Sequence, residues 1–283
     1  MMIIKSGGEQ VPYDREKVKR SILRTKAGEA IAEEVLAKVE PQMFDGITTK
    51  ELYALVHNAL KNKDICFSCR YDLRAAILRF GPAGFNFEKY VAAILKAYGW
   101  KTTVPEEDLQ GSCVAHEVDV VAEKDSRRIF IEAKFRNKYN DVVNLKDTMA
   151  TWSRFLDLVD GSAVGKCPHF DEAWIVTNAR FSNRAKQFGV CKGIHMIGWN
   201  FPSDYPFNQM VDHLALYPLT VIDELKPSEL EAFAEHGLLL CKEVAELEAD
   251  DLSGRTGISE SRVEQIIEIC ASIITEESGS EQS

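Results

Sequence analysis

The chain has 283 residues and is 45% hydrophobic, which is enough for two or three modest domains with buried cores. It shows no apolar run of membrane-spanning length, no signal peptide and an odd number of scattered cysteines, so we expect a cytoplasmic protein without a membrane partner or a disulfide framework. The formal net charge is −10, but residues 219–283 alone carry −12, so the remainder is nearly neutral and can present basic patches to a phosphate backbone.

The first 80 residues are predicted to form a small β element followed by helices. The segment "MIIKSGGEQVPY" is strand-like and is broken by two glycines. Asp14 is the expected N-cap of the first helix. The helical stretches are expected at about 14–26, 28–43, 48–62 and 64–80. The "CFSC" motif inside the last of these lacks a second cysteine pair to complete a zinc site, so its cysteines are expected to pack within a helix.

The segment from 85 to 205 is predicted to be a mixed α/β domain, separated from the first by the turn-forming "GPAG" at 81–84. Its expected elements are, in order, the helix "FNFEKYVAAILKAYG", a β-hairpin, a helix at about 142–160, the strand "EAWIVTN", the helix "NRAKQFG" and the strand "GIHMIGWN". This order indicates a sheet that contains both antiparallel and parallel strands.

The hairpin is predicted from "HEVDVVA" at 116–122 and "IFIEAKFRN" at 129–137, joined by a polar turn centred between residues 125 and 126. In that register, residues that face each other have numbers that sum to 251. Asp119 then faces Glu132 across the two strands, where side chains lie about 5 Å apart.

The charged residues Glu132 and Lys134 on this hairpin can be interpreted in two ways. Glu132 and Lys134 share one strand face, so they form either a surface ion pair or a working site. Two facing carboxylates are destabilising unless a divalent cation or a shared proton lies between them, and Lys134 supplies part of that charge. The facing of Asp119 and Glu132 therefore favours a site.

The C-terminal region, 214–275, is predicted to be helical throughout. Two short helical units lie near 225–237 and 243–270, with Gly237 and Gly257 in their connections. The final "TEESGSEQS" is acidic and rich in small residues, which is typical of a disordered tail.

In the second segment, the order and spacing of "FEKYVAAILKAYGW", "EVDVVA", "IEAK" and "IVTNARFSNRAKQFG…IHMIGW" resemble the PD-(D/E)xK nuclease superfamily, and within it the Mrr-like restriction endonucleases. The resemblance implies that Asp119 and Glu132 bind a metal ion, that Lys134 is catalytic and that Glu88 on the first helix assists the metal. Many Mrr-like relatives have glutamine where this chain has Glu132. Phosphodiester hydrolysis agrees with this set, because two carboxylates can hold Mg²⁺ or Mn²⁺ against a phosphate and a lysine can orient the attacking water.

The first segment resembles the ATP-cone, a regulatory nucleotide-binding domain, through "IIKSGGEQVPYDREKVKRSI". Lys5 and Lys17 match basic positions of that family, and Tyr13 takes its aromatic position, whereas Ser6 stands where arginine is usual. The resemblance implies ATP or dATP as a regulatory ligand. A cone kept only for dimerisation or docking is the alternative.

The third segment looks like tandem helix-hairpin-helix units, through "AEHGLLL" and "GRTGISESRVEQIIEI". Such units bind DNA phosphates, but the acidic charge of this region opposes DNA and favours a protein partner. The complete prediction is an ATP-cone-like domain at 1–84, an Mrr-like nuclease domain at 85–212, a helical domain at 213–275 and a disordered tail at 276–283.

The leading functional hypothesis is a metal-dependent DNA endonuclease that responds to adenine nucleotide and acts in restriction or defence. Two alternatives stay open: a non-catalytic nucleotide-sensing DNA-binding regulator, and a structure-specific nuclease acting on junctions or RNA. Cleavage of both strands by a protein with one site per chain would suit a homodimer, whereas nicking of one strand needs no dimer.

Overall fold

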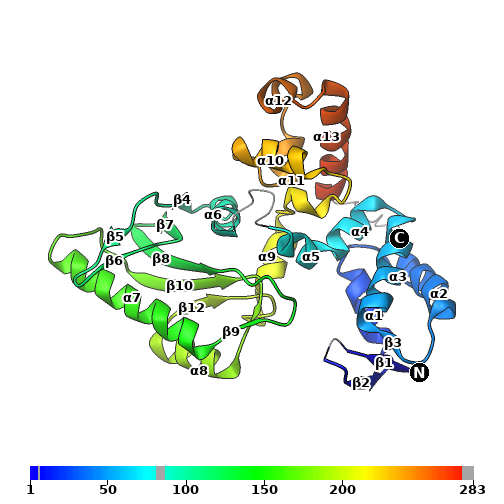
Figure 1. The fold of residues 1–283 in the computed structure, drawn as a ribbon, viewed down its shortest axis with the longest axis horizontal. Helices are drawn as coiled ribbons and strands as arrows, with labels where there is room; N and C mark the ends of the chain where they lie inside the picture. Colours follow the sequence, from blue (N-terminus) through cyan, green and yellow to red (C-terminus); the bar gives the residue numbers. More distant parts are fainter. Residues whose placement is uncertain (6, 81–86, 276–283) are drawn as a thin grey trace, which may run out of the picture. The chain divides into compact units, whose positions relative to one another are not determined.

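The computed structural model describes residues 1–5, 7–80 and 87–275, and it divides into two compact units (Figure 1). Unit 1 combines Met1–Ala76, Val221–Glu224 and the segment that begins at Cys241. Unit 2 combines Ile77–Thr220 and Leu225–Leu240. The predicted multidomain architecture, with helical terminal regions and an α/β core, is confirmed.

Two expected features, the "GPAG" boundary and the disordered tail at 276–283, lie outside the described residues. Among the residues that are described, no helix is both long and apolar enough to cross a bilayer.

Unit 1 begins with a three-stranded sheet in the order β2-β1-β3, formed by β1 (Met2–Ile4), β2 (Gln10–Pro12) and β3 (Ile47–Thr48). The strand-like opening segment is therefore a hairpin, with β1 and β2 antiparallel and β3 parallel to β1.

Helices bury the first core against this sheet: α1 (Arg15–Leu23), α2 (Glu29–Val39), the 3-10 turn η1 (Glu40–Gln42), α3 (Thr49–Lys61) and α4 (Ile65–Tyr71). Helix α5 (Leu73–Leu78) follows, and its residues are divided between the two units. Asp14 is the N-cap of α1, as predicted, and accepts a hydrogen bond from the Lys17 backbone N–H at 3.0 Å. The helix expected at 64–80 is instead two helices, because the chain leaves helical geometry at Asp72.

Three helices from the end of the chain complete unit 1: α11 (Cys241–Ala245), α12 (Ala249–Thr256) and α13 (Glu260–Ile274). Helix α13 packs on α4, and the buried Arg70 guanidinium donates to the Ile273 and Thr275 carbonyls at 2.9 and 2.7 Å. The glycine expected between the last helices, Gly257, adopts a φ of +70° that caps α12.

Unit 2 is built on a five-stranded mixed sheet in the order β12-β10-β8-β7-β4. Strands β8, β10 and β12 are parallel, whereas β7 and β4 are antiparallel to their neighbours. The strands are β4 (Lys101–Thr103), β7 (Val120–Lys124), β8 (Arg127–Lys134), β10 (Glu172–Thr177) and β12 (His195–Ile197). Two short pairs flank the sheet: β5 (Leu109–Gln110) with β6 (Ala115–His116), and β9 (Val142–Val143) with β11 (Arg180–Phe181).

Helices pack on both faces of this sheet. Helix α6 (Phe87–Ala97) contacts β4, β7 and β8, while α7 (Leu145–Ala163) contacts β10 and lies beside α8 (Asn183–Lys192). Phe130 of β8 packs against Phe155 of α7, so the alternate residues of β8 face α6. The remaining helical elements are α9 (Phe207–His213), η2 (Leu219–Val221) and α10 (Pro227–Glu235).

The β7–β8 hairpin has the predicted register. Val120 pairs with Ile131 and Ala122 with Ile129, so paired numbers sum to 251. The two turn residues, 125 and 126, adopt φ values of 53° and 65°, which is the geometry of a tight two-residue turn. The first strand begins later than expected, at Val120, because residues 115–116 pair with β5 instead.

Helix α7 approaches the β5–β6 connection closely at Gly161. A Cβ atom at this position would lie 2.7 Å from the Gly111 carbonyl carbon, a backbone atom that cannot rotate away. We expect Gly161→Ala to lower the free energy of unfolding by about 1–3 kcal/mol, the usual cost of overpacking. Urea denaturation of the full chain measures this change.

Gly254→Ala is the matched control, because Gly254 is also helical and a Cβ there meets nothing within 4 Å. That substitution should leave stability unchanged or raise it by up to about 1 kcal/mol. Equal effects at both glycines would contradict the close approach.

Candidate active site

Three predicted side chains meet at the carboxyl end of β8. Asp119 lies immediately before β7, and its carboxylate accepts the Ala133 backbone N–H at 2.6 Å. Glu132 and Lys134 share one face of β8, and the Lys134 ammonium contacts the Glu132 carboxylate. Thr177 at the end of the parallel β10 donates to the Lys134 carbonyl at 2.6 Å, so both strand ends are tied together here.

Glu132 is held by a second cation that the sequence did not reveal. Its side chain is only 2% exposed, and Arg154 of α7 donates to its two carboxylate oxygens at 3.0 and 2.8 Å. The sequence shows only that Arg154 stands beside the apolar Phe155 in a predicted helix. It does not show which strand the arginine contacts, because the helix and its partner strand are far apart in sequence.

Electrostatics at Asp119 show how closely these charges lie. The pKa of Asp119 is raised to about 6, first by burial and then by the nearby Glu132, although the Ala133 N–H and Lys134 act in the opposite direction. Glu88 on the first turn of α6 also raises this pKa. The predicted Glu88 is therefore close enough to interact with the Asp119 carboxylate.

The donor chemistry of this site fits a divalent cation. Asp119, Glu132 and Glu88 offer carboxylate oxygens, which are the ligands that Mg²⁺ and Mn²⁺ prefer. Three carboxylates and two cations leave a formal negative charge at the site, and the raised pKa of Asp119 reflects its burial first and then this nearby charge. Both Glu132 oxygens are already ion-paired, so a bound ion would share this carboxylate with Lys134 and Arg154.

Basic residues around the hairpin fall into two groups. Arg127 and Arg128 begin β8, at the opposite end of the strand from Lys134, and they pair with Glu172 and Glu123. They are therefore not part of this site.

Arg136 follows β8 directly and lies on the site's side of the strand. It pairs with Asp147 at 2.7 Å, and its backbone exchanges two hydrogen bonds with the Asn178 side chain, each 2.8 Å long. The exposed Lys138 comes two residues later. Both residues therefore follow the carboxyl end of β8 directly in the chain.

The predicted nucleotide residues lie on exposed parts of unit 1. Lys5 pairs with Glu9 at 2.9 Å across the β1–β2 turn, and the Lys17 side chain is exposed on α1. Tyr13, in the aromatic position, donates to Glu40 at 3.1 Å, and burial raises its pKa to about 12. Ser6 lies outside the described residues.

Comparison with known proteins gives the family. Residues 1–76 match the family model of the ATP cone domain, residues 82–198 that of a restriction endonuclease domain, and residues 217–274 that of the AF1548-like C-terminal domain. An uncharacterized protein of Archaeoglobus fulgidus is 32% identical over 177 residues, which make up 62% of this chain and 95% of that protein. The chain belongs to the AF1548-like family.

A solved structure of this family is also similar. It is the crystal structure of AF1548, a protein of unknown function, and its sequence is 33% identical. The TM-score is 0.57, and the match covers 66% of this chain and 96% of that chain. For this AF1548-like protein, the predicted order of cone, nuclease-like domain and C-terminal region is confirmed. The helix-hairpin-helix character of the last region and the exact domain limits stay predictions.

Asp119 should make stability depend on pH in a defined direction. Its folded-state pKa, about 6, lies above the ordinary value of 3.8, so the protonated form favours folding. This contribution is complete below about pH 4 and is lost as pH rises through about 6. Asp119→Asn stays neutral, so it should gain stability relative to the parent as pH rises from 4 to 7, by up to about 3 kcal/mol.

Thermal melting in a chelator-containing buffer measures this difference across the pH range. Asp108→Asn, which changes an exposed carboxylate, serves as the control and should show a constant difference. A flat profile for Asp119→Asn would contradict the charge crowding at this site.

Proposed function

We propose that this AF1548-like protein is a metal-dependent DNA endonuclease of restriction or defence type. The observation that carries the proposal is the convergence of Asp119, Glu132 and Lys134 at one strand end, within a domain that matches the restriction endonuclease family model. A lone surface ion pair would not need the second carboxylate or the buried position of Glu132.

Asp119, Glu132 and Glu88 would hold Mg²⁺ or Mn²⁺, which supplies charge neutralisation at the scissile phosphate and lowers the pKa of a bound water. Lys134 stands beside the same carboxylate, where its ammonium can hold the attacking water and stabilise the charge that develops on the phosphate. Ala133 fixes the Asp119 carboxylate through its backbone N–H, so Asp119 keeps one orientation.

Arg154 acts through Glu132 as a positioning residue. Its guanidinium contacts both oxygens of that carboxylate and comes from α7, which packs on the sheet. It holds the Glu132 carboxylate in one orientation at the strand end, and it supplies positive charge near an incoming phosphate.

Substitutions at the carboxylates and the lysine test the proposal directly. Asp119→Asn should abolish magnesium-dependent plasmid cleavage, because an amide lacks the charge to hold the ion, and Glu132→Gln should nearly do so. Lys134→Ala should slow cleavage by about 10²-fold or more while the protein still binds metal. Glu88→Gln should have a milder effect, because a carboxylate from the first helix of the domain would reach the ion through a water molecule.

Glu117→Gln is the matched control, since Glu117 is an exposed carboxylate two residues before Asp119 and should be dispensable. Each variant is also melted, because Glu132→Gln removes the partner of two cations. If Asp119→Asn folds like the parent and cuts at the parent rate, the active site lies elsewhere. DNA binding without any cleavage by the parent would instead support the non-catalytic regulator.

Adenine nucleotide regulation is the second part of the proposal, supported by the ATP cone match at residues 1–76. Lys5 and Lys17 would contact the phosphates of ATP or dATP. Cleavage of plasmid, single-stranded, junction and RNA substrates, with and without these nucleotides, separates the DNA endonuclease from a structure-specific or RNA nuclease. A homodimer, and a protein partner of the acidic C-terminal region, belong to the proposal as well.

Calorimetry of the full chain with ATP, ADP and dATP should show binding that Lys5→Ala and Lys17→Ala each weaken by about tenfold, equivalent to about 1.4 kcal/mol for a lost phosphate contact. Lys50→Ala is the control, because Lys50 is another exposed lysine of unit 1. Absence of binding at millimolar nucleotide would make the cone a docking or dimerisation module. Binding without any change in cleavage would place regulation in a partner.

A further inference from the structure

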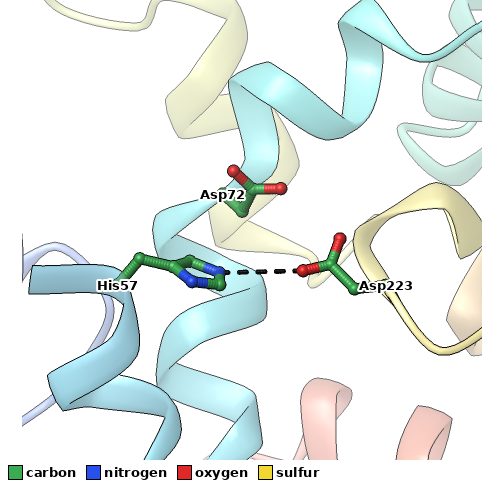
Figure 2. A group of neighbouring side chains, drawn as sticks. All are labelled: His57, Asp72 and Asp223. Atoms are coloured by element: carbon green, nitrogen blue, oxygen red, sulfur yellow. Dashed lines mark ion pairs between the residues drawn. The ribbon is translucent and has the colours of Figure 1, made fainter. Parts of the chain in front are cut away.

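A group of potential metal ligands lies in unit 1, away from the nuclease-like sheet. The side chains of His57, Asp72 and Asp223 each offer one donor atom, and these three atoms lie within 4.8 Å of one another (Figure 2). Figure 2 shows the Asp223 carboxylate directed toward the imidazole of His57, with the Asp72 carboxylate close to both. All three residues belong to the same compact unit.

Three separate elements supply these ligands. His57 comes from the middle of α3, Asp72 from the junction of α4 and α5, and Asp223 from the segment Val221–Glu224. Asp72 is buried at 5% exposure, whereas the Asp223 side chain is 42% exposed. The group is therefore buried at Asp72 and accessible to solvent at Asp223, where an ion can enter.

Neighbouring aromatic rings hold two of the ligands in place. Tyr53 donates a hydrogen bond to one Asp72 oxygen, and its ring stacks on His57 with centroids 6.2 Å apart. Tyr53 also stacks on Tyr71 at 4.9 Å, which fixes its own position. A ligand that is oriented by a second hydrogen bond or by ring packing is typical of built metal sites.

The charges around this group point to a cation. The Nε2 atom of His57 lies 4.0 Å from an Asp223 oxygen, which is too long for a hydrogen bond. Burial and then nearby anions, including Asp223 and Asp72, raise the pKa of the adjacent Cys69 thiol. The Asp72 and Asp223 carboxylates therefore place negative charge beside the group, and Lys61 offsets part of it at Asp223. A divalent ion would compensate more of this charge.

We propose that His57, Asp72 and Asp223 bind Zn²⁺ or a neighbouring divalent transition-metal ion. One imidazole with two carboxylates is a set that such ions accept, with a further position left for water. Donors of one tetrahedral zinc ion lie about 3.4 Å apart, so side-chain adjustments of about 1 Å close the site. The open side at Asp223 supplies that freedom.

Bound metal would fasten Val221–Glu224 to α3 and to the α4–α5 junction. Ion pairing already joins the same parts, because Lys61 of α3 contacts Glu224 at 2.6 Å. The Glu224 carbonyl also accepts a hydrogen bond from Arg262 of α13 at 2.9 Å. The ion would thus hold Val221–Glu224 against the helices of unit 1. Because it binds the folded state, it would raise the stability of that unit.

Cobalt binding to the full-length chain tests this site. The experiment uses the Asp119→Asn protein, because this substitution weakens metal binding at the candidate nuclease site. Titration of that protein with Co²⁺, followed by absorption, should show one bound equivalent, at the new site. His57→Gln and Asp223→Asn should each lower the Co²⁺ affinity by about tenfold or more, because each removes a ligand of the ion. Zn²⁺ at about 100-fold excess over its dissociation constant should raise the melting temperature of the Asp119→Asn protein but not of these two variants.

His236→Gln is the matched control, since it removes an exposed histidine from unit 2 and should change neither readout. Asp223→Asn keeps the test valid if the variant at His57 folds poorly, because Asp223 lies nearest the surface. Parent-like Co²⁺ affinity in both variants would overturn the proposal. So would a spectrum dominated by thiolate-to-cobalt charge transfer, which would assign the ion to cysteines.

Discussion

The burial of the Glu132 carboxylate is the constraint on which the nuclease-like unit depends. A charged group that is 2% exposed is costly unless cations compensate it, and here Lys134 and Arg154 do so. Because Arg154 belongs to α7, the ion pair requires that helix to lie against the strand end. The apolar contact of Phe155 with Phe130 meets the same requirement, so packing and electrostatics favour one placement of α7.

A second constraint is the register of the hairpin, which brings Asp119 beside Glu132. A slip by one residue would turn the alternating side chains of β8 to the opposite face, moving Phe130 away from Phe155 and separating the two carboxylates. The two-residue turn with positive φ at both positions holds that register. The site therefore follows from backbone pairing, and the raised pKa of Asp119 follows from its burial there and, after that, from the adjacent Glu132.

Sequence alone predicted what depends on local pattern. Strand alternation and a polar turn were enough for the hairpin register, and hence for the facing of Asp119 and Glu132. Long-range packing could not be predicted in this way: the pairing of Arg154 with Glu132 and the docking of α13 on α4 join segments with no shared periodicity. The helix break at Asp72 was missed for a related reason, since that break is stabilised by tertiary contacts such as the Tyr53 hydroxyl.

At the candidate active site, a metal ion would compete with the protein's own cations for the Glu132 carboxylate. At the strand end, Lys134 and Arg154 already occupy the Glu132 oxygens, so an incoming ion gains less from that carboxylate than from Asp119. A raised pKa at Asp119 means that metal binding there must also displace a proton below about pH 6, which couples ion affinity to pH. In the proposed nuclease, Lys134 and Arg154 beside Glu132 would then also compensate the phosphate, whose negative charge arrives only with the substrate.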